Sequence, residues 1–167
     1  HCDEGYTGSS TTFTCQADGQ FDGQMPDCEA NPCTSDEPAG DHVVHDCNGR
    51  TTTQECHAEC DTGYHGDRNA FTCQASGSFT GNNPTCHANT CGDGGKPSGA
   101  HVTHDCDGKV TNEPCTAQCA AGYSGSSTTF TCQTSGLFTG MNPTCEANTC
   151  GGGGKPSGAH VTHNCDG

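Results

Sequence analysis

Apolar side chains are sparse along this chain and fall in short groups between runs of glycine, serine, threonine and asparagine. The segments 101–104 (His-Val-Thr-His) and 129–132 (Thr-Phe-Thr-Cys) are rich in β-branched and aromatic residues, which favour strands. The Gly-Ser-Ser-Thr-Thr stretches and the glycines at 151–154 predict loops. No segment has the periodicity of an amphipathic helix. The pattern predicts an all-β chain of short strands separated by turns.

The composition shows that few side chains are available for a core. Only 28% of the 167 residues are hydrophobic, 17 of these are cysteines, and Leu137 is the one leucine. Large apolar side chains contribute roughly 1.5–3 kcal/mol each when buried, so few of them cannot offset the cost of ordering the backbone. Cysteine is about a tenth of the chain, which predicts a small disulfide-rich fold in an oxidising, extracellular compartment. We expect two small cores over the bridges, formed by Tyr64, Phe71 and Phe79 and by Tyr123, Phe130 and Phe138.

The cysteines define an internal repeat. Equivalent cysteines recur 58 or 59 residues apart, as at Cys2, Cys60 and Cys119, with six cysteines in each unit. This spacing divides the chain into a C-terminal half-module (1–28), two whole modules (33–86 and 91–145) and an N-terminal part of a further module (150–167). The linkers have four residues and are bracketed by cysteines, which predicts modules arranged end to end as a semi-rigid rod. Because the sequence starts and stops within a module, we expect it to be an interior piece of a longer protein.

The repeat resembles the sushi module, also called the complement control protein module. The second whole module matches its pattern with Cys91, Pro97, Val102, Cys-Ala-Ala-Gly-Tyr at 119–123, Cys132, Gly-Leu-Phe at 136–138 and Pro-Thr-Cys at 143–145. The first whole module matches at Cys33, Pro38, 60–64, Cys73, 77–79 and 84–86. Two features depart from the family. Phenylalanine stands at the usual tryptophan position (Phe21, Phe79, Phe138), and each module has an additional cysteine pair.

The resemblance implies bridges from the first to the third and from the second to the fourth family cysteine. These are Cys33–Cys73, Cys60–Cys86, Cys91–Cys132, Cys119–Cys145 and, in the half-module, Cys2–Cys28.

The additional cysteines have a separate interpretation. Asn48-Gly49 and Asp107-Gly108 are dipeptides that favour two-residue hairpin turns. A hairpin returning from each turn would bring together Cys47 with Cys56 and Cys106 with Cys115. Three cysteines then remain, and we expect their partners outside this sequence: Cys15, Cys150 and Cys165.

The charge excludes some classes of partner. Five Lys and Arg against 20 Asp and Glu leave a net charge of −15, which opposes binding to nucleic acid or to anionic lipid. No apolar stretch approaches the ~18 residues of a membrane span, so no membrane insertion is expected. We expect no dedicated cofactor, although Ca²⁺ could be bound loosely between the acidic chains.

The histidines raise the question of a metal site. His101 and His104 repeat His42 and His45, with Asp105 and Asp107 nearby as further weak candidates. Side chains at i and i+3 of a strand point to opposite faces, which is poor geometry for one ion. The Asp-x-Asp-Gly segment has its glycine too early for an EF-hand. We therefore predict no metal site, and exposed or interfacial histidines.

Neither an activated nucleophile nor a pair of carboxylates in a cleft is evident, so we predict that the chain is not an enzyme. The Ser/Thr stretches suit either O-glycosylation or simple solvation of polar loops. The candidate glycan sites are Ser9, Ser10, Thr11, Thr12, Ser126, Ser127, Thr128 and Thr129.

Two functions remain. The near-identical modules favour a structural segment of an extracellular fibre, sheath or flagellar-hair-like filament, in which the chain contacts copies of itself and carries glycans. The alternative, implied by the sushi resemblance, is an adhesion, receptor or complement-type recognition ectodomain. Modules that recognise a ligand need surfaces that differ between modules.

Overall fold

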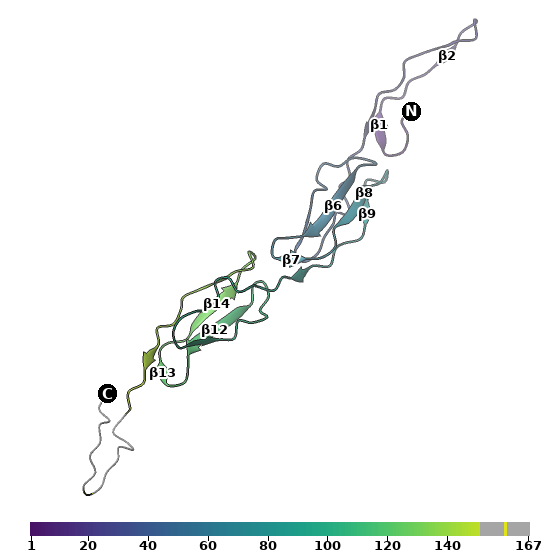
Figure 1. The fold of residues 1–167 in the computed structure, drawn as a ribbon. Coiled ribbons are helices and arrows are strands. Elements are labelled where there is room, and N and C mark those ends of the chain that lie inside the picture. The colour runs from purple at the N-terminus through teal and green to yellow at the C-terminus, as the bar shows by residue number, and fades with distance from the viewer. Residues whose placement is uncertain (151–158, 160–167) are drawn as a thin grey trace. The chain divides into compact units, whose positions relative to one another are not determined.

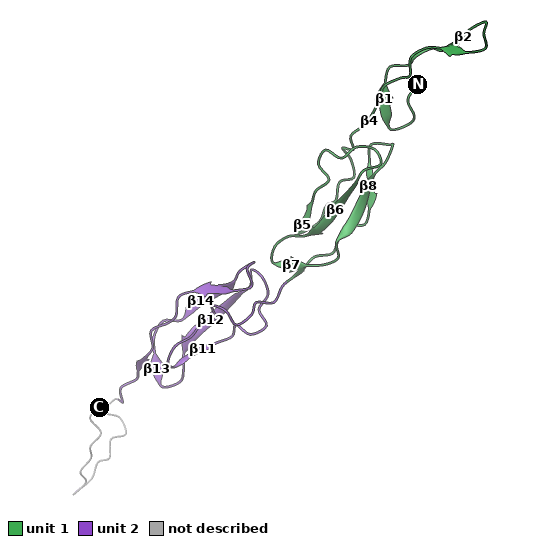
Figure 2. Ribbon diagram, turned by 45° about the horizontal axis from the view of Figure 1, so that its top comes forward, with its two compact units in different colours: residues 1–88 green, residues 89–167 purple. Residues whose placement is uncertain are grey.

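The chain divides into two compact units, residues 1–88 and 89–167 (Figure 2). The computed structural model describes residues 1–150 and residue 159. The division falls within the predicted linker at 87–90. Residues 1–28 and 33–86, predicted as separate modules, lie in one unit. The described elements are all strands, as the sequence predicted. The end-to-end rod stays a prediction.

The first unit contains a four-stranded antiparallel sheet with the order β5-β6-β8-β9 (Figure 1). Two-stranded pairs β1-β4, β2-β3 and β7-β10 accompany it. The strands are β1 (Tyr6–Gly8), β2 (Thr14–Cys15), β3 (Phe21–Asp22), β4 (Cys28–Ala30), β5 (Val43–His45), β6 (Glu55–Cys60), β7 (Tyr64–His65), β8 (Asn69–Cys73), β9 (Phe79–Gly81) and β10 (His87–Ala88).

The second unit repeats this arrangement, with a four-stranded sheet in the order β11-β12-β14-β15 and the pair β13-β16. Its described strands are β11 (Val102–His104), β12 (Pro114–Cys119), β13 (Tyr123–Ser124), β14 (Thr128–Cys132), β15 (Phe138–Gly140) and β16 (Glu146–Ala147). Strand β14 confirms the strand predicted at 129–132 but begins one residue earlier, so the prediction of a loop at Thr128 was wrong. Thr128 and Thr129 pair with Ala117 and Thr116 of β12, and that tertiary pairing outweighs the Ser/Thr composition.

The central strand β6 separates the core from the surface by simple alternation. Cys56 and Ala58 are completely buried. His57, which lies between them, and Glu59, which follows Ala58, point to the other face. Successive side chains of a strand alternate in this way. The alternation sets the two faces of the sheet: one carries the core and the other carries charged groups.

Disulfides and phenylalanines make up each core. In the first whole module, Phe71 and Phe79 are each 3% exposed and pack among Cys33, Cys47, Cys56, Ala58 and Cys73. Phe130 and Phe138 occupy the same places in the second module. The expected contribution of Tyr64 and Tyr123 to the cores was wrong. Both are half-buried outside the clusters, where each stacks on a histidine.

The structure contains the same seven disulfides that the sequence predicted. Within the two whole modules and the half-module they are Cys2–Cys28, Cys33–Cys73, Cys47–Cys56, Cys60–Cys86, Cys91–Cys132, Cys106–Cys115 and Cys119–Cys145. Cys15 and Cys150 are exposed and form no disulfide among the described residues, so their pairing with cysteines outside this sequence stays a prediction. Cys165 and the predicted loop at 151–154 lie outside the described residues.

The turn at Asn48-Gly49 forms, but it does not close a two-residue hairpin. Gly49 has φ 75°, while Asn48 is not among the residues with positive φ, so the type I′ turn is absent. A second turn at 51–54 follows before β6 begins. The pair Cys47–Cys56 nevertheless forms, because the register that pairs His45 with Ala58 places these cysteines opposite each other.

The half-module and the first whole module are joined by a buried contact. The hydroxyl of Thr52, which is 4% exposed, donates to the Gly5 carbonyl at 2.8 Å. Gly5 has φ +85°, and a Cβ there would lie 2.7 Å from Thr52 Cγ2. Glycine is therefore required at this position both for the backbone conformation and for the close approach. This junction explains why residues 1–88 form one unit.

Candidate functional site

The outer face of the first sheet carries charged groups in a shallow hollow. We define the β5–β6 face as Val44, His45, Asp46, His57, Glu59 and Arg68, which line a hollow of about 200 Å³. Strands β5 and β6 position it by pairing Val44 with Glu59 and by continuing this register to Asp46 and His57. The core beneath these strands fixes which side chains point outward.

Ion pairs and a backbone contact order this face. Arg68 Nε lies 3.3 Å from Glu59 Oε2, and Arg50 Nη2 lies 3.1 Å from Asp46 Oδ2. Asp46 Oδ1 also accepts the backbone N–H of His57 at 2.6 Å. This hydrogen bond and the neighbouring Arg50 charge hold the pKa of Asp46 below its usual value. The aspartate therefore remains ionised at any neutral or mildly acidic pH.

The equivalent surface of the second module has fewer charged groups. It is lined by Thr103, His104, Asp105, Thr116 and Gln118 and encloses about 370 Å³. The cysteine register aligns Thr116 with His57 and Gln118 with Glu59, and it aligns Ser127 with Arg68. The buried positions beneath are unchanged, with Ala117 for Ala58 and phenylalanine at both core sites.

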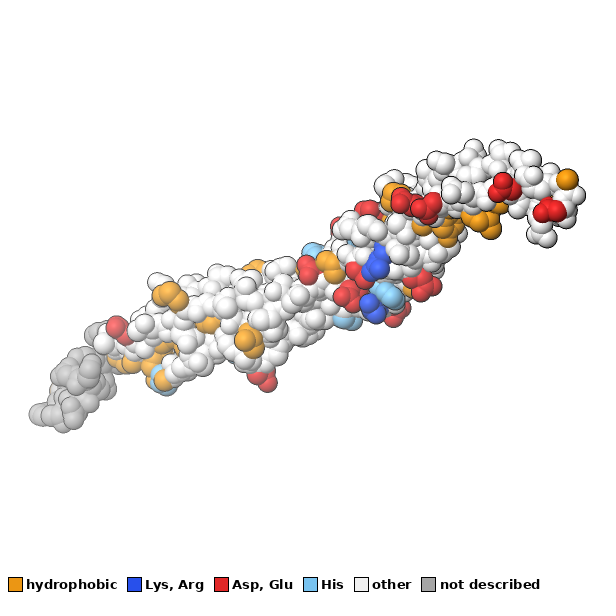
Figure 3. All heavy atoms as spheres, turned by 90° about the horizontal axis from the view of Figure 1, so that it is seen from above, with side chains coloured by type: hydrophobic (Ala, Val, Ile, Leu, Met, Phe, Trp, Pro, Cys, Tyr) orange, Lys and Arg blue, Asp and Glu red, His pale blue; other side chains and the backbone are white. Residues whose placement is uncertain are grey.

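The charge of the chain is similarly concentrated in one unit. Residues 1–88 contain 14 acidic residues and two arginines, a net charge of −12, whereas residues 89–167 contain six acidic residues and three lysines, a net charge of −3. On the face drawn in Figure 3, acidic, basic and histidine side chains gather over part of the first unit. Loose screening of this charge by Ca²⁺ stays a prediction.

The repeated histidines have structural partners. His42 stacks on Tyr64 with ring centroids 3.6 Å apart, and His101 stacks on Tyr123 at 3.7 Å. His45 Nδ1 accepts the backbone N–H of Cys47 at 3.3 Å, and His104 does the same for Cys106. Both members of each pair therefore recur because the modules share a local fold. Spacing in the sequence did not reveal these partners.

The weak metal candidates each make other contacts in the structure. His101 and His104 have the partners just described, and Asp105 Oδ1 accepts the Thr116 N–H at 2.6 Å. Asp107 pairs instead with Lys96, whose Nζ lies 2.6 Å from Asp107 Oδ1 and 2.7 Å from Asp93 Oδ1. The hydrogen bond from Lys96 lowers the pKa of Asp107, and the Asp107 and Asp93 carboxylates raise the pKa of Lys96.

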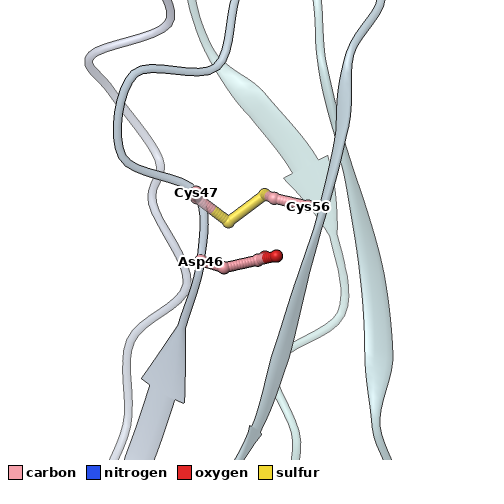
Figure 4. Close-up of side chains that lie close together, drawn as sticks. All are labelled: Asp46, Cys47 and Cys56. Atoms are coloured by element: carbon pink, nitrogen blue, oxygen red, sulfur yellow. A yellow bond between two sulfur atoms is a disulfide. The ribbon is translucent and has the colours of Figure 1, made fainter.

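Asp46, Cys47 and Cys56 form a cluster whose composition could suggest a metal ion. Figure 4 shows the two cysteine sulfurs joined to each other with Asp46 beside them. A metal-binding cysteine must be a thiolate, and these sulfurs are in a disulfide. The same holds for Asp105, Cys106 and Cys115. Both clusters are therefore structural.

Most of the candidate glycan sites are accessible. Ser9, Ser10, Thr12, Ser126, Ser127 and Thr129 are exposed, whereas Thr11 and Thr128 are half-buried. The hydroxyl oxygens of Thr11 and Thr128 are inaccessible, which makes these two threonines poor acceptors. Glycosylation of the exposed residues stays a prediction.

Sequence analysis did not single out His57, Glu59 and Arg68. Aligning the two whole modules on their cysteines would have shown that charged residues of one are replaced by neutral residues in the other. The alignment alone could not show that these three positions lie on one face, because Arg68 belongs to the turn before β8.

Comparison with known proteins supports the resemblance. The chain is 30% identical over 154 residues to E-selectin of Equus caballus and 32% identical over 160 residues to P-selectin of Mus musculus, covering 87% and 89% of the chain. It is 28% identical over 145 residues to the sushi, von Willebrand factor type A, EGF and pentraxin domain-containing protein 1 of Rattus norvegicus. The repeats are sushi-type modules. No protein-family model matches the chain.

This chain spans only 25%, 20% and 4% of the lengths of those three relatives. Its sushi modules and seven disulfides place it outside the cell or at the cell surface. The relatives favour the adhesion or receptor alternative over the fibre, since none is a filament protein by name. That Phe21, Phe79 and Phe138 occupy the position of the family's usual tryptophan stays a prediction. Among the described residues, no helix is long and apolar enough to cross a membrane.

Proposed function

We propose that this chain is a non-catalytic recognition segment of an extracellular adhesion or receptor-type protein, and that the β5–β6 face of module 33–86 contacts the partner. The difference between the two whole modules carries this proposal. Their cores are alike, whereas His57, Glu59 and Arg68 stand where the second module has Thr116, Gln118 and Ser127. A segment selected only as a repeating structural unit has no need for such a difference.

The chemistry of the face indicates the kind of partner. The unit has a net charge of −12, and the two acidic groups of the face are already paired, Glu59 with Arg68 and Asp46 with the neighbouring Arg50. Basic groups of a partner protein would be attracted by this unit, and the ordered ion pairs would fix their orientation. The similarity to E-selectin and P-selectin supports an adhesive role.

The test compares cell binding by the native chain and by two variants. Biotinylated chain is assembled on fluorescent streptavidin and incubated with several animal cell lines at low and high salt. We expect saturable binding that decreases with salt. In His57→Thr/Glu59→Gln/Arg68→Ser the binding should fall severalfold, because the variant removes the Arg68–Glu59 ion pair that orients the partner's basic groups while the net charge of the unit stays at −12.

The matched control is Thr53→Asn/Gln54→Glu. It also introduces residues of the second module, but at the turn before β6, where Glu113 makes the same backbone contact as Gln54. This control should bind like the native chain. Equal binding by the triple variant, or concentration-dependent polymers in sedimentation with no cell binding, would overturn the proposal and favour the fibre.

A further inference from the structure

Two histidines face each other at the end of the first whole module. His65 in β7 and His87 in β10 are directly opposite in an antiparallel pair, with ring centroids 5.8 Å apart and ring planes at 42°. Both residues are exposed. Side chains at opposed positions of antiparallel strands project from the same face. The two imidazoles are therefore accessible to a common ligand from solvent.

The backbone beneath this pair is held in place by covalent and packing contacts. The Cys60–Cys86 disulfide joins the segments that lead into both strands. Tyr64, on the opposite face of β7, stacks on His42 at 3.6 Å. A Cβ at Gly66 would lie 2.3 Å from the Thr85 carbonyl oxygen, so the two segments are in close contact. Metal affinity benefits from such ordering, because less conformational freedom is lost on binding.

The separation of the rings suits one metal ion. An imidazole nitrogen binds Zn²⁺ at about 2.0–2.1 Å, so two rings on one ion have centroids at most about 6.5 Å apart. The observed 5.8 Å lies within this limit. We propose that His65 and His87 form a binding site for a divalent transition-metal ion. The site binds Cu²⁺ more tightly than Zn²⁺, following the general order of these metals with nitrogen ligands.

This site is specific to module 33–86. The equivalent cross-strand pairs are Thr7 with Glu29 in the half-module and Ser124 with Glu146 in the second whole module. With two protein ligands, the ion retains open positions for water or for a donor atom of a partner. The inference is independent of the β5–β6 face and goes beyond the proposed function.

The sister modules also supply the variants for the test. His65→Ser and His87→Glu introduce the residues found at the equivalent positions of the second repeat, Ser124 and Glu146, so the fold should be kept. Calorimetric titration of the full chain with CuCl₂, after acetylation of its terminal amine and alkylation of its unpaired cysteines, should detect one tightest site. His65→Ser removes a ligand and should weaken that site more than about 100-fold, which exceeds the roughly 10–100-fold lost when only a partner of a metal ligand is removed. His87→Glu keeps an oxygen ligand and should weaken the site less.

His57→Thr is the matched control and should leave the tightest site unchanged. Electron paramagnetic resonance should show two coordinated nitrogens in the native chain and one in each variant. On the native chain, substoichiometric Cu²⁺ should broaden the ring resonances of His65 and His87 before those of other histidines, a readout that needs no variant. Unchanged affinity in both variants, or broadening that begins at other histidines, would overturn the site.

Discussion

Removal of the Cys47–Cys56 bridge is the sharpest test of the idea that disulfides replace a hydrophobic core here. The variant Cys47→Ala/Cys56→Ala leaves the other disulfides of the module intact. Both cysteines are completely buried in the core cluster that also contains Ala58, Phe71 and Phe79. The substitution therefore removes a covalent constraint and core volume at once.

The expected cost has two parts. Removing a bridge between cysteines 9 residues apart raises the entropy of the unfolded chain. This lowers the free energy of the unfolded state by about 2.6 kcal/mol in the chain-entropy description. Loss of two buried sulfurs, taken as similar to methylene groups, adds about 1.6 kcal/mol. A module of this size has a free energy of unfolding of about 3–8 kcal/mol. The variant should lose half or more of that stability.

Urea unfolding followed by NMR provides the assay, with the amides of Ala58 and Ala117 reporting on the two whole modules separately. The free energy of unfolding reported by Ala58 should fall by the amount above. The value reported by Ala117, in the untouched module, should stay unchanged. Cys60→Ala/Cys86→Ala is the comparison variant. Its loop, with a separation of 26, predicts a larger entropic loss of about 3.5 kcal/mol, but the bridge is half-buried outside the core. A shift at Ala58 below about 1 kcal/mol in the first variant would refute the reasoning, because entropy alone should exceed it.

Three further changes test other contacts. Thr52→Val removes the hydrogen bond to the Gly5 carbonyl and should cost about 1–3 kcal/mol, seen as a lower unfolding midpoint of module 33–86; Thr52→Ser should retain most of it. Because Lys96 holds the pKa of Asp107 below the usual 3.8, their contact stabilises the fold at neutral pH and is lost as pH falls through the folded pKa. Asp107→Asn should abolish that dependence in acid titrations followed by carbon NMR, and an Asp107 that titrates at the usual value would contradict it. Gly66→Ala places a Cβ 2.3 Å from a carbonyl oxygen and should destabilise the module by about 1–3 kcal/mol in thermal unfolding, unlike substitution at an open surface position.

Part of the candidate site could be predicted from the repeat, and part could not. The cysteine register already aligned His57 with Thr116 and Glu59 with Gln118, so the charge difference was present in the sequence. It did not reveal that Arg68 pairs with Glu59, because the contact joins the end of β6 to the turn before β8. Similarly, His65 and His87 are 22 positions apart and become a pair only when β7 and β10 align.

The sequence by itself predicted the all-β class and the pairs Cys47–Cys56 and Cys106–Cys115, which the structure confirms. The other five disulfides were implied by the resemblance to the sushi module, and the module boundaries stay a prediction. Composition predicted that disulfides are needed at all, because a chain with so few apolar residues depends on covalent bridges. Tertiary structure alone decided that Tyr64 leaves the core to stack on His42, that Thr128 joins a strand, and that Asn48-Gly49 turns within a longer connection. Each of these depends on which backbone segments pair across the sheet, and that pairing is set by the side chains buried beneath them rather than by local sequence preference.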